Sequence, residues 1–208
     1  MTRSFRFLLH DTRWRLLTLV WECLFLAVFY AVTGYGARYG YGINISGFLM
    51  PTLVILASTL GNCAAPNALS LGGRRIDIFW GIQGCALVYA LCATLLTLAV
   101  NAITGVLGWP VLDLNLAVAL FYPFACFALS ILGTLAGILA PRRRWLSVLL
   151  FVGLVLLSIL LCFSLLLYSG GRLQLWGSLP WLIPLILGLL WLAGEGFIYR
   201  EIQRLCVR

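Results

Sequence analysis

The chain has 208 residues, of which 63% are hydrophobic and only 10% are charged. A soluble domain carries roughly 25% charged residues to cover its surface, so this composition excludes an ordinary soluble protein and favours a protein surrounded by lipid. The net charge of +8 would suggest nucleic-acid binding in a soluble protein, but here the arginines fall in short segments between apolar runs. They are expected to set membrane orientation, and nucleic acid is not an expected partner.

The chain also lacks residues that several common chemistries require. It contains no lysine, which excludes a Walker A phosphate loop and a pyridoxal Schiff base. Seven scattered cysteines without a C-x-x-C pair, mostly inside apolar runs, are typical of buried thiols. With a single histidine besides, we expect no catalytic residue, no metal site and no cofactor in this chain.

The first segment, residues 1–15, is interrupted by charged residues and does not resemble a cleaved signal peptide, so the apolar run that follows is expected to stay in the mature protein. At 100° per residue its apolar and basic positions fall on separate arcs, which predicts an amphipathic helix lying on the inner leaflet. A disordered basic tail is the alternative. The residues expected to form this interfacial helix surface include Phe5, Arg6, Leu8, Leu9 and Arg13.

Six apolar segments are long enough to cross about 30 Å of hydrocarbon at about 1.5 Å per residue. They lack the alternation of a barrel strand, and lipid offers no partner for backbone amides, so α-helices are expected. The chain is thus predicted to be a single all-α transmembrane domain over residues 1–208. The predicted spans are approximately 16–33, 45–65, 78–103, 114–139, 146–168 and 179–198.

Two features inside these spans stand out. Glu22 lies one to two turns into the first span, where an unpaired carboxylate is unfavourable, so it should face a cavity or a partner. Snorkelling toward the inner interface, or pairing with a nearby arginine, is the alternative. Gly133 and Gly137 form a G-x-x-x-G pair, which permits close backbone approach to a neighbour in the same chain or in another.

Arginines are distributed unevenly over the connections. Twelve lie in the N-terminal segment, the second and fourth connections and the C-terminal tail, whereas the three opposite loops hold only Arg38 and Arg172. Because positive charge is retained on the cytoplasmic side, both ends of the chain are expected to be cytoplasmic.

The second connection, residues 66–77, is the most informative. Pro66 suits the first turn of a short helix, Gly72 and Gly73 would end it, and Asp77 would lie in the first turn of the third span. This pattern predicts a short helix lying across the membrane face.

A basic pair, Arg74 and Arg75, follows that short helix, either as a contact for another protein or only to fix topology. The run from Ala68 to Gly81, ALSLGGRRIDIFWG, resembles the loop between the second and third spans of six-helix bacterial ATP-binding-cassette (ABC) exporter permeases of the ABC-2-type group. The basic N-terminal helix, six spans and inward-facing ends also resemble that group. The run departs from the family at Gly73, where a serine or threonine is usual.

The resemblance implies a membrane subunit that pairs with a second permease subunit, identical or different, and with separate ATPase subunits that bind ATP and Mg²⁺. It places the protein in the bacterial inner membrane. The 66–77 segment would be the coupling helix seated in the ATPase, and the N-terminal helix would be a second contact. The residues of the coupling contact would be Leu69, Leu71, Gly72, Gly73, Arg74, Arg75 and Asp77.

The expected function is therefore outward transport of a hydrophobic or amphipathic substrate, such as a peptide, drug or lipid. One alternative is the membrane component of a small-molecule importer, which would use a polar pocket in its own bundle. Another is a non-transporting immunity or scaffold protein, which would use its spans only for association.

Overall fold

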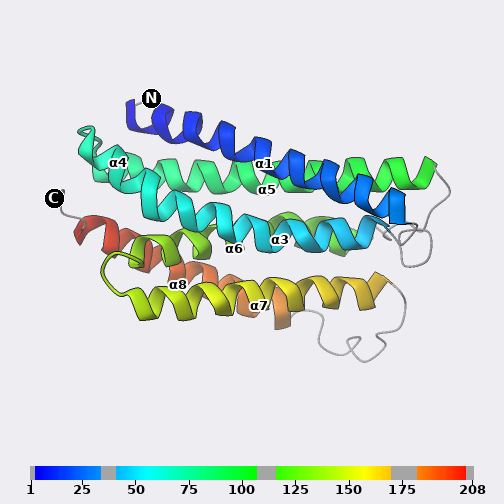
Figure 1. Ribbon diagram of the computed structural model, residues 1–208. Coiled ribbons are helices and arrows are strands. Elements are labelled where there is room, and N and C mark those ends of the chain that lie inside the picture. The colour runs from blue at the N-terminus through cyan, green and yellow to red at the C-terminus, as the bar shows by residue number, and fades with distance from the viewer. Residues whose placement is uncertain (1–2, 34–40, 107–115, 170–181, 205–208) are drawn as a thin grey trace.

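The computed structural model describes residues 3–33, 41–106, 116–169 and 182–204, which form helices joined by short turns (Figure 1). α1 begins and α8 ends at the same end of the bundle. The elements are α1 (Arg3–Thr33), α3 (Tyr41–Thr59), the π-helix η1 (Leu60–Ala64), α4 (Ala65–Ser70), α5 (Arg75–Val106), α6 (Leu116–Leu139), α7 (Arg144–Ser169) and α8 (Leu182–Arg204).

Five helical runs are long and apolar enough to cross a membrane, namely the run that ends in α4 and then α5, α6, α7 and α8. The chain is therefore a multi-pass, all-α membrane protein, which confirms the reading of its composition. The five runs coincide with the second to sixth predicted spans, and α8 continues past the predicted end at residue 198 to Arg204. The first predicted span, 16–33, lies in α1, which is not among the five runs found in the described residues, so that span stays a prediction.

The predicted interfacial helix over 1–15 and the predicted first span form one continuous helix, and where this helix meets the membrane stays a prediction. α1 is one helix of 31 residues, or about 46 Å at 1.5 Å per residue. No glycine or proline occurs between Arg3 and Thr33, so nothing in the sequence interrupts the helix. Leu8, expected on the lipid-facing arc, is instead fully buried against α5, where a Cβ at Gly81 would lie 2.5 Å from its Cδ1 atom.

The predicted short helix is present as α4, with Pro66 in its first turn, but it is not separate from the second span. The chain stays helical from Tyr41 to Ser70 and passes through the π turn Leu60–Ala64 just before Pro66. A proline inside a helix clashes with the carbonyl four residues earlier, here that of Asn62. Because Asn62 lies in the wider π turn, the helix can continue through the proline. The short helix α4 is thus a continuation of the second span.

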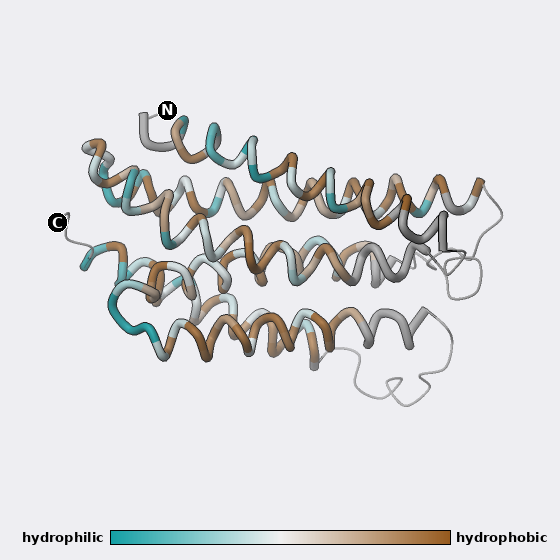
Figure 2. The backbone as a smooth tube through the Cα atoms, viewed as in Figure 1, coloured by the Kyte–Doolittle hydropathy of each residue, from teal (hydrophilic) through white to brown (hydrophobic). Residues whose placement is uncertain are grey.

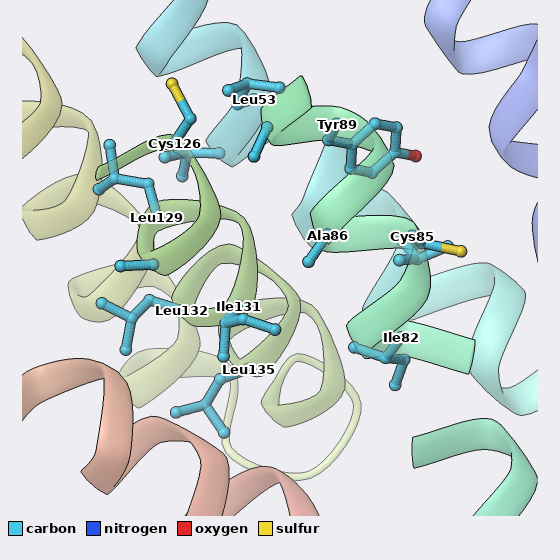
Figure 3. Packing of buried hydrophobic residues seen from close by; sticks show 14 of the residues in the cluster. Leu53, Ile82, Cys85, Ala86, Tyr89, Cys126, Leu129, Ile131, Leu132 and Leu135 are labelled. Carbon is cyan, nitrogen blue, oxygen red and sulfur yellow. The ribbon is translucent and has the colours of Figure 1, made fainter. Parts of the chain in front are cut away.

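α6 is the central helix of the bundle. Residues 128–139 are all buried, and α6 packs against α3, α5, α7 and α8. Its buried hydroxyls are satisfied locally, because Ser130 and Thr134 each donate to the carbonyl four residues earlier at 2.8 Å. Figure 3 shows the aliphatic side chains of this helix, among them Leu129 and Leu135, in the core beside α5.

Small residues bring α6 into direct backbone contact with the α3–η1 run. A Cβ added at Gly133 would lie 2.9 Å from the Val54 carbonyl oxygen, and one added at Gly137 would lie 2.8 Å from the Asn62 amide nitrogen. From the other side, a Cβ added at Gly61 would collide with the α6 backbone. The neighbour of the G-x-x-x-G pair is therefore in the same chain.

Replacing Gly137 by alanine should lower the free energy of unfolding by about 1–3 kcal/mol, because the added methyl group overpacks a contact between two backbones. Titration of the purified protein from mild detergent into sodium dodecyl sulfate measures this change. Gly153→Ala is the matched control, since no atom lies within 4 Å of a Cβ at that position. Equal stability of the two variants would remove the α3–α6 contact as the basis of the packing.

Candidate functional site

The turn between α4 and α5 has a defined backbone conformation. The Gly72 N–H donates to the Leu69 carbonyl oxygen and the Gly73 N–H to the Ala68 carbonyl oxygen, both at 3.0 Å, which is the Schellman arrangement. Gly72 has a φ of +82°, a left-handed conformation that costs a residue with a Cβ roughly 1–2 kcal/mol. The helix end predicted at this glycine pair is confirmed.

The side chains of this segment divide into buried and exposed ones. Leu69 is buried and holds α4 against the bundle, whereas Leu71 is 72% exposed. Arg74 and Arg75 are exposed as well, and Asp77 lies in the first turn of α5, as predicted, where helix-end polarity favours a carboxylate. The surface available to a partner is thus formed by Leu71 and the two arginines, not by Leu69.

Four arginine-bearing segments meet at one end of the bundle: the first half of α1, the α4–α5 turn, the α6–α7 turn and the end of α8 (Figure 1). Figure 2 shows hydrophilic residues at this end, which we call the basic end. Within it, Arg142 pairs with Glu201 at 3.5 Å and donates to the Arg204 carbonyl oxygen, which ties the α6–α7 turn to α8. The grouping agrees with the arginine distribution, while the side of the membrane it faces stays a prediction.

α1 and α3 meet through polar side chains. Arg15 pairs with Asp11, one turn earlier, with 2.7 Å between Nη2 and Oδ2. Across the interface, its Nη1 donates to Thr59 Oγ1 and to the Leu56 carbonyl oxygen. The Arg15 side chain is only 17% exposed, so this charge is neutralised and hydrogen-bonded inside the protein. Sequence reasoning treated Arg15 only as an orientation signal.

Glu22 reaches the same face of α3, seven residues further along α1. Thr52 Oγ1 lies 2.7 Å from Glu22 Oε1 and 3.0 Å from the Phe48 carbonyl oxygen. The alternative of pairing with an arginine is not seen, because none of the ion pairs among the described residues includes Glu22. In the predicted first span, a carboxylate with only a neutral partner would be unfavourable by on the order of 2.5–3.5 kcal/mol.

A further polar contact, which the sequence did not indicate, joins α1 to α5. Thr12 Oγ1 lies 3.1 Å from Cys85 Sγ. The same Thr12 hydroxyl donates to the Leu8 carbonyl oxygen at 2.8 Å. One turn along α5, the buried Tyr89 hydroxyl has no hydrogen-bond partner among the described residues. Figure 3 shows the oxygen of Tyr89 and the sulfur of Cys85 pointing away from α6. At these two positions α5 presents polar atoms to a face other than the one packed on α6, while further along the helix Thr97 donates to the Tyr122 hydroxyl of α6 at 3.0 Å.

An open pocket of about 240 Å³ lies where α3 and η1 meet α6 and α7. Its lining includes Ser58, Asn62 and Ser147, and the Ser147 hydroxyl donates to the Ala136 carbonyl oxygen at 2.7 Å. Pockets that hold drug-sized ligands have volumes of roughly 300–1,000 Å³. This pocket is too small to enclose a large amphipathic molecule.

Replacing Gly72 by alanine should raise amide hydrogen exchange in the α4–α5 turn by about 5- to 30-fold, because the left-handed φ becomes unfavourable. Mass spectrometry of the exchanged protein measures this change. Gly73→Ala, whose position does not have a positive φ, is the neighbouring control and should leave exchange near the wild-type rate. Unchanged protection in both variants would mean that the Schellman hydrogen bonds do not hold the turn.

Among the described residues, no group of three or more His, Cys, Asp or Glu side chains could hold a metal ion. No protein-family model, curated protein or solved structure matches the chain. The properties established above are those of a multi-pass helical membrane protein with one basic end.

Proposed function

We propose that the chain is the membrane-spanning permease subunit of an ABC exporter, which moves a hydrophobic or amphipathic substrate outward with ATP hydrolysed by a separate subunit. The observation that carries this proposal is the exposed, conformationally defined basic turn between α4 and α5. It combines Leu71 with Arg74 and Arg75 on a Schellman turn at the basic end. An exposed leucine between hydrophilic groups is suited to a pocket on a protein partner.

The turn joins two helices that both pack on the central helix of the bundle. α4 continues the α3–η1 run, which contacts α6 backbone to backbone, and the turn leads directly into α5. Leu69, buried at the base of α4, joins the turn to the bundle. A displacement imposed on the turn would therefore move two helices that pack on the central helix, rather than only a loop.

In this proposal the chain works in the bacterial inner membrane, with both ends in the cytoplasm and with a second permease subunit beside it. ATP and Mg²⁺ are bound by the partner ATPase, since this chain has no lysine for a Walker A loop. The closed ATPase dimer would bind one packing of the helices more tightly than the other. The equilibrium between inward-open and outward-open packings would shift accordingly.

Single cysteines introduced at Arg74 and Arg143 in a cysteine-free background should both react with a membrane-impermeant maleimide from the cytoplasmic side only. Both positions are exposed and lie in turns at the basic end. Labelling of intact cells and of inverted vesicles distinguishes the two sides. Reaction of position 74 from outside would contradict the proposal, because no cytosolic motor could then reach the turn. Reaction of the two positions from opposite sides would contradict the placement of the whole basic end in the cytoplasm.

The double variant Arg74→Glu, Arg75→Glu should abolish stimulation of a co-purifying ATPase while leaving membrane insertion largely intact. Arg143→Glu with Arg144→Glu is the matched control, because it makes the same charge change in another exposed turn of the basic end. The measurement is ATP hydrolysis by the complex reconstituted with candidate ATPase subunits.

Equal loss in both double variants would indicate a general charge effect, and full stimulation in the 74–75 variant would remove the turn from the mechanism. Failure of every candidate ATPase to form a stoichiometric complex would favour the importer or scaffold alternatives.

A further inference from the structure

Glu22 lies where the buried face of α1 meets its exposed face. Leu19 and Cys23 are buried, whereas Trp21 is 70% exposed and Phe25 is 69% exposed. The half-buried Glu22 lies between these two faces. At about 100° per residue, Phe25 stands one turn away from Glu22 and displaced toward the exposed face. The carboxylate is therefore accessible from the outer surface of the bundle, beside an aromatic ring.

α3 also carries an exposed phenyl ring, one turn from its contact with Glu22. Thr52 holds the carboxylate, and Phe48, one turn earlier on α3, is 47% exposed. Glu22 and Thr52 are each seven residues from the Arg15–Thr59 contact, so α1 and α3 run antiparallel in a fixed register. This register brings Phe48 to nearly the same level as the ring on α1. Each of the two helices thus carries an exposed phenyl ring one turn from the contact between Glu22 and Thr52.

No charged side chain on the described parts of the neighbouring helices pairs with Glu22. Arg15 is about 10 Å away along α1, at 1.5 Å per residue, and is already paired with Asp11. α3 contains no charged residue, and α5, the other helix packed on α1, carries charges only in its first turn, at residues 75 and 77. Among the described residues, no positively charged side chain is paired with Glu22.

We infer that Glu22, flanked by Phe25 and Phe48, binds the positively charged group of an amphipathic cation that reaches it from the surrounding lipid. The carboxylate neutralises the cation, the rings contact it through their π faces, and Thr52 holds the carboxylate in place. The apolar body of the ligand stays in hydrocarbon, so no enclosed cavity is needed. That this ligand is the transported substrate rests on the proposed function, whereas the binding itself does not.

Tetraphenylphosphonium and tetraphenylborate test the inference, because they have nearly the same shape and opposite charges. The full chain in nanodiscs of zwitterionic lipid should bind tetraphenylphosphonium saturably, after subtraction of binding to empty nanodiscs, and should not bind tetraphenylborate in this way. Glu22→Gln removes the charge but keeps the hydrogen bond to Thr52, and it should weaken binding by about tenfold or more.

Two control variants make the result specific. Glu22→Asp keeps the charge and should restore most of the affinity lost in Glu22→Gln. Glu195→Gln removes a carboxylate from α8 and should leave the affinity within about twofold of wild type. Undiminished binding by a Glu22→Gln protein that elutes as wild type in size-exclusion chromatography would overturn the inference, as would equal binding of the anion.

The assay contains no ATPase, so it separates this inference from the proposed function. Glu22-dependent binding, together with failure of every candidate ATPase to form a complex, would support the site and contradict the exporter. ATPase stimulation through the α4–α5 turn without Glu22-dependent binding would do the reverse.

Discussion

The backbone contact between α6 and the α3–η1 run is the constraint on which the rest of the bundle depends. In lipid, apolar side chains gain little by leaving their surroundings, so helices associate through close packing of small residues. Gly133 and Gly137 on α6 and Gly61 on η1 leave no room for a Cβ between the two backbones. α6 is thereby buried at the centre, and α5, α7 and α8 pack on its remaining faces.

The same contact determines where the basic turn lies. Gly61 and Asn62 belong to the π turn, and this widened turn both meets α6 and accommodates Pro66. The helix consequently continues into α4 and ends only at the Schellman turn around Gly72. Sequence reasoning places a helix start at this proline. In the structure the helix continues through it, because the clash between the proline ring and the preceding carbonyl is relieved in the π turn one turn earlier.

Hydropathy predicts six spans, and five of them coincide with runs that are long and apolar enough to cross a membrane. The glycine pair predicts the helix end before α5, and the arginine distribution predicts the gathering of basic residues at one end. These features follow from residues close together in the sequence. The continuity of α1, the burial of Leu8 and the α3 partner of the G-x-x-x-G pair depend on contacts between distant segments, which periodicity does not specify. Glu22 was recognised as unusual because of its depth, but its partner Thr52 follows only from the register of α1 against α3.

α3 physically links the two proposed sites. Thr52 precedes Ser70, the last residue of α4, by about 27 Å of helix at 1.5 Å per residue. On one side α3 meets α6 through glycine contacts that leave no space for sliding, since a shift would press backbone on backbone. On the other side it meets α1 through side-chain hydrogen bonds, which tolerate small displacements. A force applied at the basic turn would therefore change the Glu22–Thr52 contact before it disrupted the α3–α6 contact, and this order would couple the basic turn to Glu22.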